Sequence, residues 1–220
     1  MKYDPYKKAT PIKTRAYNNE FRRQQHAALK ASIAAATAEL HAEKGAIATT
    51  YADIAKRAGV SLPTVYSHFP TQNELLQGCT AHVIARAPTL PIEKIQAATD
   101  LPTVAKLLTL AMEQQHLHFE PWLCWREDRV VPFLAEMVAG IRQANVELVE
   151  KLLVNHNVQG RHRELAAAWE SMLSFDVWHR MVRQHQLPLQ AVRRIIIQCL
   201  LAIVGSTPIS PTTPSPRRKS

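Results

Sequence analysis

The short segment from Ser61 to Phe69 sorts its side chains onto two faces. Val65 and Phe69 are four residues apart, so a helix would place both on one apolar side that anchors it inward. The outward side would carry the side chains able to contact a partner, which are Leu62, Pro63, Thr64, Ser67 and His68. Such a helix fits the major groove of B-form DNA, with its N-terminal residues nearest the base edges.

Two short helices joined by a tight turn are predicted to position this segment. Thr50 and Asp53 form a capping box that opens the first helix, and Ser61 can cap the second. Between them, Ala58 is small enough for the helices to cross closely, and Gly59 supplies the positive φ of the turn. The pattern is that of a helix-turn-helix.

Further helices flank this motif. Thr71 and Glu74 form a second capping box, for a helix that should run to about Arg86. The helix before the motif should begin near Gln24 and end at Gly45. Its apolar residues recur at helical spacing and are Leu29, Ile33, Ala36 and Leu40. Residues 24–86 are therefore predicted to form the head, a three-helix unit that contains the helix-turn-helix and is followed by a fourth helix.

Residues 29–76 resemble the TetR family of transcriptional regulators. The resemblance rests on several features in order along the chain, which are the small-residue helix ending at Gly45, the Thr49–Thr50 pair, Ile54-Ala55, Ala58-Gly59-Val60-Ser61, Thr64, Tyr66, Phe69 and Leu75. A match of this length is far more specific than a bare helix-turn-helix. Two residues depart from the pattern, because the family commonly has Phe where His41 stands and Lys where Gln72 stands.

The resemblance implies base contacts from residues 62–64 and phosphate contacts from Tyr66 and His68. It also implies further backbone contacts at Thr50 and Tyr51, where the free amides of a helix start favour an anion. At Gln72 an uncharged amide would hold a phosphate more weakly, and with less salt dependence, than lysine. The candidate DNA-binding residues together are Thr50, Tyr51, Ser61, Leu62, Pro63, Thr64, Tyr66, Ser67, His68 and Gln72.

Positive charge is concentrated at the two ends of the chain. The formal net charge is +9; residues 1–24 hold seven bases and two acids, giving +5, and the last four residues give +3. Residues 1–23 are predicted to be a disordered basic arm, and residues 206–220 a disordered Pro-rich basic tail. Such tails suit a polyanion such as nucleic acid, and the alternative is a solubilising role. The arm could reach the neighbouring minor groove.

Residues 87–205 are predicted to form a larger helical body, so the fold class is all-α. Helices are expected from Asp100 to about His118, from Pro132 to about His156, over residues 162–186, and from Leu189 to Val204, with a short Trp-rich segment opening at Pro121. The last helix is apolar nearly all round and must be covered on more than one side. The resemblance implies that the last two helices form a homodimer, which DNA geometry also requires.

The resemblance further implies a small-molecule pocket between the central helices of the body. Aromatic, methionine and histidine side chains could line it, and the candidates are Met112, His116, Phe119, Trp122, Trp125 and Met137. Ordinary core packing is the alternative interpretation of each of these residues. The pattern predicts a ligand-released repressor of a palindromic operator, and the alternative is a DNA-binding scaffold without a ligand.

Several other classes find no support in the sequence. The nucleophile-elbow and phosphate-loop motifs are absent, which predicts a protein that is not an enzyme and has no cofactor. No metal is expected, because His116 and His118 would lie on different sides of a helix and no CxxC pair occurs. Cys79, Cys124 and Cys199 are interpreted as small core residues. With no signal peptide or membrane span, the chain is expected to be soluble and cytoplasmic.

Overall fold

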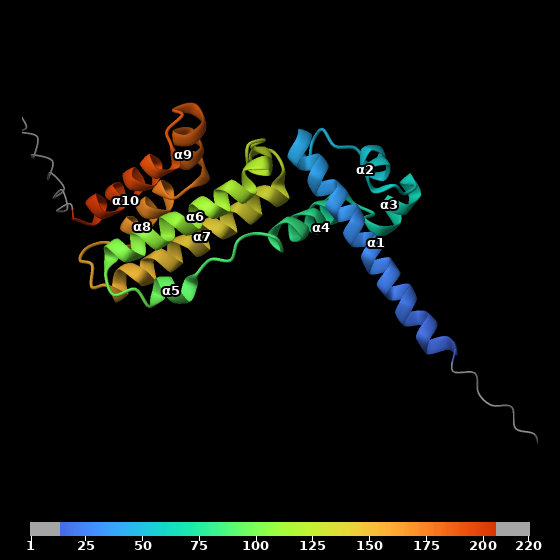
Figure 1. Cartoon of the computed structure of the whole chain (residues 1–220), viewed down its shortest axis with the longest axis horizontal. Helices are drawn as coiled ribbons and strands as arrows, with labels where there is room; N and C mark the ends of the chain where they lie inside the picture. The colour runs from blue at the N-terminus through green and yellow to red at the C-terminus, as the bar shows by residue number, and fades with distance from the viewer. Residues whose placement is uncertain (1–13, 206–220) are drawn as a thin grey trace, which may run out of the picture. The chain divides into compact units, whose positions relative to one another are not determined.

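The computed structural model describes residues 14–205, and every regular element in that range is helical (Figure 1). The expected all-α fold class is confirmed. The chain divides into two compact units, one up to Arg86 and the other from Ala87 onward, here called the head and the body. None of the helices described is long and apolar enough to span a membrane.

The head consists of four helices, α1 (Thr14–Lys44), α2 (Tyr51–Ala58), α3 (Leu62–His68) and α4 (Gln72–Ile84). Helix α1 packs against α2 and α4, and α2 packs against α3. Their shared core contains the predicted anchors together with residues of α1 and α2, and its buried members are Ile33, Ala34, Leu40, Ile54, Ala55, Val65, Phe69 and Leu75. The spacing of apolar residues thus located the core of the head correctly.

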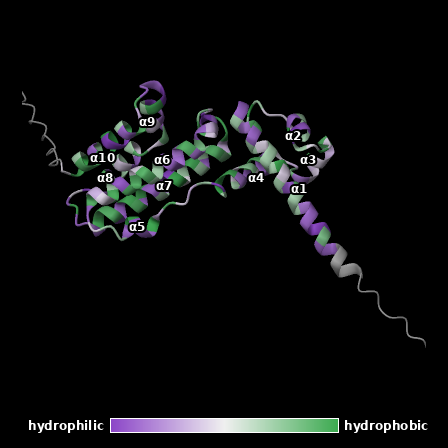
Figure 2. Ribbon diagram, in the orientation of Figure 1, coloured by the Kyte–Doolittle hydropathy of each residue, from purple (hydrophilic) through white to green (hydrophobic). Residues whose placement is uncertain are grey.

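Helix α1 is longer than the apolar pattern indicates. It begins at Thr14, so the prediction of a disordered arm over residues 1–23 is wrong for residues 14–23. The N-terminal part of α1 extends past the other helices of the head (Figure 1), and its residues 19–26 are mostly hydrophilic (Figure 2). Apolar periodicity reports the face that a helix buries, whereas helix formation needs only favourable backbone propensity, and no Pro or Gly interrupts residues 14–44. Residues 1–13 of the predicted arm and the predicted tail lie outside the described residues.

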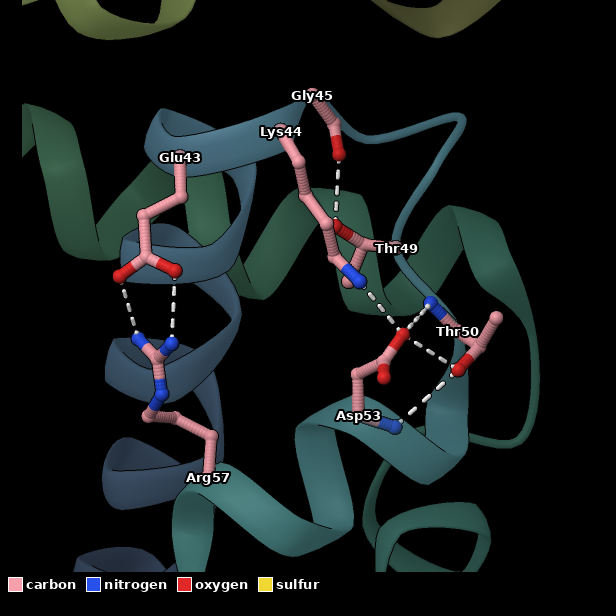
Figure 3. A network of polar contacts seen from close by, with 7 residues as sticks. All are labelled: Glu43, Lys44, Gly45, Thr49, Thr50, Asp53 and Arg57. Carbon is pink, nitrogen blue, oxygen red and sulfur yellow. Dashed lines mark hydrogen bonds and ion pairs between the residues drawn. The ribbon is translucent and has the colours of Figure 1, made fainter.

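A polar network holds the corner between α1 and α2 (Figure 3). Thr50 caps α2 by accepting a hydrogen bond from the backbone N–H of Asp53 at 3.2 Å, and the Asp53 carboxylate accepts from the Thr50 N–H at 3.0 Å. Lys44 at the end of α1 donates to the same carboxylate at 2.7 Å. The Thr50–Asp53 capping box is therefore confirmed, and Lys44 ties it to the preceding helix.

The body begins with α5 (Ile92–Gln96) and α6 (Leu101–Leu123), followed by η1 (Glu127–Arg129) and α7 (Pro132–Asn155). It ends with α8 (His162–Met172), α9 (Phe175–His179), the π-helical η2 (Arg180–Gln184) and α10 (Leu189–Gly205). Helix α7 packs against α8, and α10 packs against both α6 and α8. Among the largest fully buried side chains of the body are Trp169, Trp178, Leu152, Leu153 and Leu200.

Two predicted helices of the body have different bounds in the structure. The segment 162–186 is not one helix, because Ser174 caps a new helix by accepting from the Val177 N–H at 3.5 Å. Helix α6 does not end near His118 but continues to Leu123 with Pro121 inside it. A proline in the last turn removes only one intrahelical hydrogen bond, so the helix tolerates it there.

The three cysteines have different surroundings. Cys79 is buried in the head, where burial raises the pKa of its thiol to about 12. Cys199 is half-buried, and Cys124 at the end of α6 is exposed. The interpretation of all three as core residues is therefore wrong for Cys124, because the irregular segment after Leu123 leaves its side chain uncovered.

Candidate nucleic-acid interface

Helix α3 is fixed to the head by its apolar back. Val65 and Phe69 are almost completely buried, and the tip of the α2–α3 turn is Gly59 with φ +68°. The N-terminus of α3 is capped by Ser61, whose hydroxyl accepts from the Thr64 N–H at 3.3 Å. Each of these three features was predicted from residue type and spacing. Together they hold a seven-residue helix by one side and both ends.

The front of α3 is accessible to solvent at its N-terminal end. Leu62, Pro63, Tyr66 and Ser67 are exposed, and Thr64 is half-buried with its hydroxyl 2.7 Å from that of Ser61. A large exposed leucine at the start of a capped helix has no role in the core. The structure therefore brings the expected base-contacting residues 62–64 together on an accessible surface.

His68 does not belong to this exposed front. Its side chain is 8% exposed, and its ring centroid lies 4.2 Å from that of His26 on α1. Burial lowers the pKa of His68, and the nearby charges of His26 and Lys30 lower it further, so the ring stays neutral near pH 7. The expected outward orientation is wrong, because His26 and Lys30 of α1 lie against this end of α3, and no pattern within α3 reveals that contact.

Tyr51 and Tyr66 form one rigid unit between α2 and α3. Their rings stack at a centroid distance of 4.4 Å and an angle of 9°. The Tyr51 hydroxyl donates to the backbone carbonyl of Phe69 at 3.2 Å, and burial raises the pKa of this phenol. The Tyr51 hydroxyl thus already donates its hydrogen bond within the head. Tyr51 supports Tyr66, whose exposed ring carries the free phenol of the pair.

The start of α2 lies beside this tyrosine pair and is exposed at Thr50. Its N3 residue, Asp53, would repel an anion if its charge were uncompensated. The Lys44 ammonium and the Thr50 hydroxyl hold the pKa of Asp53 far below its usual range, and the same Lys44 contact supplies a compensating positive charge. Gln72, the first residue of α4, is also exposed. The starts of α2 and α4 are thus both accessible to solvent, at Thr50 and at Gln72.

Helix α1 adds a basic face that sequence reasoning did not single out. Arg22, His26 and Lys30 are four residues apart, so they share one side of the helix. His26 contacts His68, and the Lys30 Nζ lies 5.1 Å from the ring centroid of Phe69, which places this side next to the C-terminal end of α3. Arg22 is exposed one turn farther along. The regular spacing of the three bases was the available signal.

The candidate pocket residues of the body are only partly brought together. Met112 and His116 line a cavity of about 10 Å³, whereas Phe119, Trp122, Trp125 and Met137 do not border it. Phe119 and Trp122 instead lie beside His118 farther along α6, and Trp125 is exposed. A cavity of this size holds about one water molecule. The space between the central helices is therefore nearly closed in this structure.

Two of the residues that sequence reasoning missed around this cavity are charged. Glu113 of α6 is 4% exposed and accepts hydrogen bonds from Arg193 of α10, at 2.8 Å from Nε and 2.5 Å from Nη2. His116 Nε2 donates to the Leu173 carbonyl at 2.8 Å, and burial lowers the pKa of its imidazole to about 4. Two charged residues eighty positions apart leave no local pattern. Within residues 14–205, no three metal-ligating side chains gather in one place.

Comparisons with known proteins agree with this geometry. Residues 33–79 match the family described as bacterial regulatory proteins, tetR family. A transcriptional regulator of Aquifex aeolicus is 21% identical, with a TM-score of 0.60 over 80% of this chain and 99% of that one. NalD of Pseudomonas aeruginosa, the secondary repressor of the MexAB-OprM efflux pump, is 19% identical, with a TM-score of 0.62 over 81% and 96%.

A third solved structure, the SmeT–triclosan complex, is 18% identical, with a TM-score of 0.58 over 80% of this chain and 90% of SmeT. None of the curated proteins matches the chain in sequence. The likeness to these structures extends over both units and establishes the fold. The match of residues 33–79 coincides with the helix-turn-helix whose front is accessible, so this part of the chain is similar to bacterial regulatory proteins of the tetR family.

Proposed function

We propose that this chain is a DNA-binding transcriptional regulator of the TetR family, a homodimeric repressor that binds a palindromic operator through α3 and is released by a small molecule bound in the body. The observation that carries the proposal is the construction of α3, an apolar back locked into the head and an accessible N-terminal front. A helix held in this way enters the major groove as a rigid part, so that its first residues meet the base edges.

The exposed residues divide into two kinds of contact. Leu62, Pro63 and Thr64 read the bases, because they occupy the first turn of α3. Thr50, Tyr66 and Gln72, with the helix-start amides beside them, hold the phosphates on either side of the groove. Ser61 contributes as the cap that orients Thr64, and Ser67 as a further exposed hydroxyl. His68 is left out of this set because α1 buries it.

Two recognition helices must face the same side of the duplex, about 34 Å apart, to read two half-sites. The outward faces of α8 and α10 support a dimer that would hold the two recognition helices at this spacing. On α10, Ala191, Ile195 and Ala202 lie on the side opposite its buried residues, and on α8 the exposed outer residues include Ala167 and Ser171. Small residues let helices approach closely, which suits a four-helix contact between two copies.

Release by a ligand is supported by one related structure. SmeT, which shares the fold, was solved as a complex with triclosan. A ligand of the present chain would act by favouring the conformation that does not fit the operator. If screening of small apolar compounds gave neither thermal stabilisation nor release of DNA, the alternative of a scaffold that binds DNA without a ligand would be favoured.

Selection of bound duplexes from random DNA tests the central proposal. The purified full chain should enrich an inverted repeat, and the enriched sequence defines half-site and spacing together. Leu62→Ala and Thr64→Ala should change which bases are enriched, whereas Tyr66→Phe should weaken binding to all sequences about equally. Enrichment of no sequence, or of one without two-fold symmetry, would contradict the proposal.

A further inference from the structure

Glu113 and Arg193 form an ion pair whose two partners have very different access to water. The Glu113 side chain is 4% exposed, while that of Arg193 is 37% exposed. Burial of a carboxylate is costly unless a cation remains beside it. The guanidinium, in contrast, sits on a long flexible side chain that already reaches solvent and can move there at low cost. The acid is the fixed partner and the base is the exchangeable one.

The walls around the pair are apolar or uncharged. Glu113 and Arg193 border the small cavity together with Met112, Leu173, Val192 and Ile196. His116 also lines it and is neutral at pH 7, because burial lowers the pKa of its imidazole to about 4. Apart from Arg193, no positive charge on these walls would repel a cation. An anion in the same place would meet the buried carboxylate of Glu113.

A second observation favours this cavity as a ligand-binding site. Trp178, which also lines it, is 1% exposed, and its indole Nε1 has no hydrogen-bond partner among the described residues. A buried N–H without a partner costs free energy, and an acceptor atom brought in by a guest would recover it. The residues that line the cavity thus include a tryptophan with an unsatisfied donor and a deeply buried acid.

We propose that the body binds an organic cation, a lipophilic amine that carries a hydrogen-bond acceptor, with its ammonium group on Glu113 in place of Arg193 and its apolar part between α6 and α10. The inference rests on the proposed sensor role of the body and names the class of ligand. The acceptor of the guest takes the hydrogen bond of the Trp178 indole. Displacement of Arg193 outward then breaks the tie between α6 and α10, which is one contact of the helix proposed to form the dimer.

The room for such a guest must come from a movable wall, because the cavity of about 10 Å³ is too small. Leu173 and Trp178 stand on the segment where the backbone is least regular. Helix α8 ends at Met172, α9 has five residues, and the π-helical η2 follows directly. This wall is joined to α6 by the hydrogen bond from His116 to the Leu173 carbonyl. Its outward shift, together with that of Arg193, enlarges the site.

Three compounds of one skeleton test the charge of the ligand. They are 3-phenoxypropylamine, 3-phenoxypropan-1-ol and 4-phenoxybutanoate, titrated calorimetrically into the full chain at pH 7 without DNA. The amine should bind at least about tenfold more tightly than the alcohol, because a buried charge-assisted hydrogen bond is much stronger than a neutral one. The carboxylate should bind more weakly still. Binding of either of these two as tight as that of the amine, or no binding of the amine at millimolar concentration, would overturn the proposal.

Glu113→Gln should abolish the preference for the amine, since the amide keeps the shape and a hydrogen bond to Arg193 but not the charge. Glu120→Gln is the matched control, because Glu120 is also on α6 and pairs with Arg183 at 2.6 Å, but does not line the cavity. Its affinity for the amine should equal that of the unaltered protein. An amine preference retained in Glu113→Gln would refute the assignment.

Arg193→Gln should act in the opposite direction and tighten amine binding about tenfold, because the competing cation is gone. Far-ultraviolet circular dichroism shows whether this variant folds. If it does not, the comparison of Glu113→Gln with Glu120→Gln is sufficient to test whether Glu113 binds the amine. The same preparations should be tested for operator binding without ligand. Enrichment of an inverted repeat by a protein that binds no amine would reject this inference and leave the DNA-binding proposal intact.

Discussion

His116 is a neutral histidine in the core of the body, where its Nε2 donates to the Leu173 carbonyl. Burial lowers its pKa to about 4, from the 6.5 expected of a histidine in water. Above pH 6.5 His116 is unprotonated in both the folded and the unfolded state, and its titration does not lower the free energy of unfolding. Below pH 6.5 only the unfolded chain takes up the proton, so the free energy of unfolding falls until the folded state is protonated near pH 4.

This histidine should therefore make the body less stable in mild acid, by about 2 kcal/mol at pH 5 relative to pH 7.5. His116→Gln should lose less stability over the same interval, since Gln can also donate to Leu173 but does not titrate. Urea unfolding, followed by the fluorescence of the buried Trp169 and Trp178, measures the difference. His185→Gln, at an exposed position, should behave like the unaltered protein. An equal loss in His116→Gln would contradict the assignment.

At the scale of elements, the close approach of α4 to α3 depends on Gly78. A β-carbon built at this position would lie 2.5 Å from Phe69 Cε1 and 2.9 Å from its Cζ, and Phe69 is buried with no room to withdraw. The anchor of the recognition helix and the small residue opposite it are thus one packing unit. Overpacking of this kind typically costs about 1–3 kcal/mol.

Gly78→Ala should therefore lower the free energy of unfolding of the head by an amount in that range. Gly140→Ala is the matched control, since α7 is helical at Gly140 and a β-carbon there would meet nothing within 4 Å. It should raise stability by about 0.5–1 kcal/mol, because alanine favours the helix. Chemical unfolding of both variants measures the two effects, and stabilisation by Gly78→Ala would show that Phe69 is not fixed as described.

The extension of α1 is the second element with a measurable consequence. Its basic side faces the end of α3, so Arg22 should contact a phosphate outside the groove that α3 occupies. Arg22→Gln should weaken binding to every operator and reduce the slope of log affinity against log salt by about one. Lys94→Gln removes the same charge from an exposed position on α5 and should leave the slope unchanged. Equal slopes for Arg22→Gln and the unaltered protein would exclude this contact.

At the scale of the whole molecule, DNA binding and self-association should be linked. Ile195 is half-buried on the outer side of α10, where a second copy would cover it. Ile195→Glu should give a folded monomer in light scattering and should lower operator affinity at least about tenfold, because the second head no longer binds in the same event. Val154→Glu, at an exposed apolar position of α7, is the control that should stay dimeric. A dimeric Ile195→Glu protein would place the interface elsewhere.

The sequence by itself determined the features that depend on neighbours within about four residues. The capping boxes at Thr50 and Thr71, the left-handed Gly59 and the pairing of Val65 with Phe69 are all short-range, so residue type and spacing sufficed to predict them. All of these features lie within residues 29–76, where the sequence resembles the TetR family, and within residues 33–79, which match the model of that family.

Only the tertiary structure decided which side chains those helices cover and which charges they bring together. His68 is buried by a turn of α1 forty-two residues earlier, and Glu113 meets Arg193 eighty residues later. Both depend on how one helix is rotated against another, which is set by the packing of the whole core. No spacing rule within a single helix contains that information.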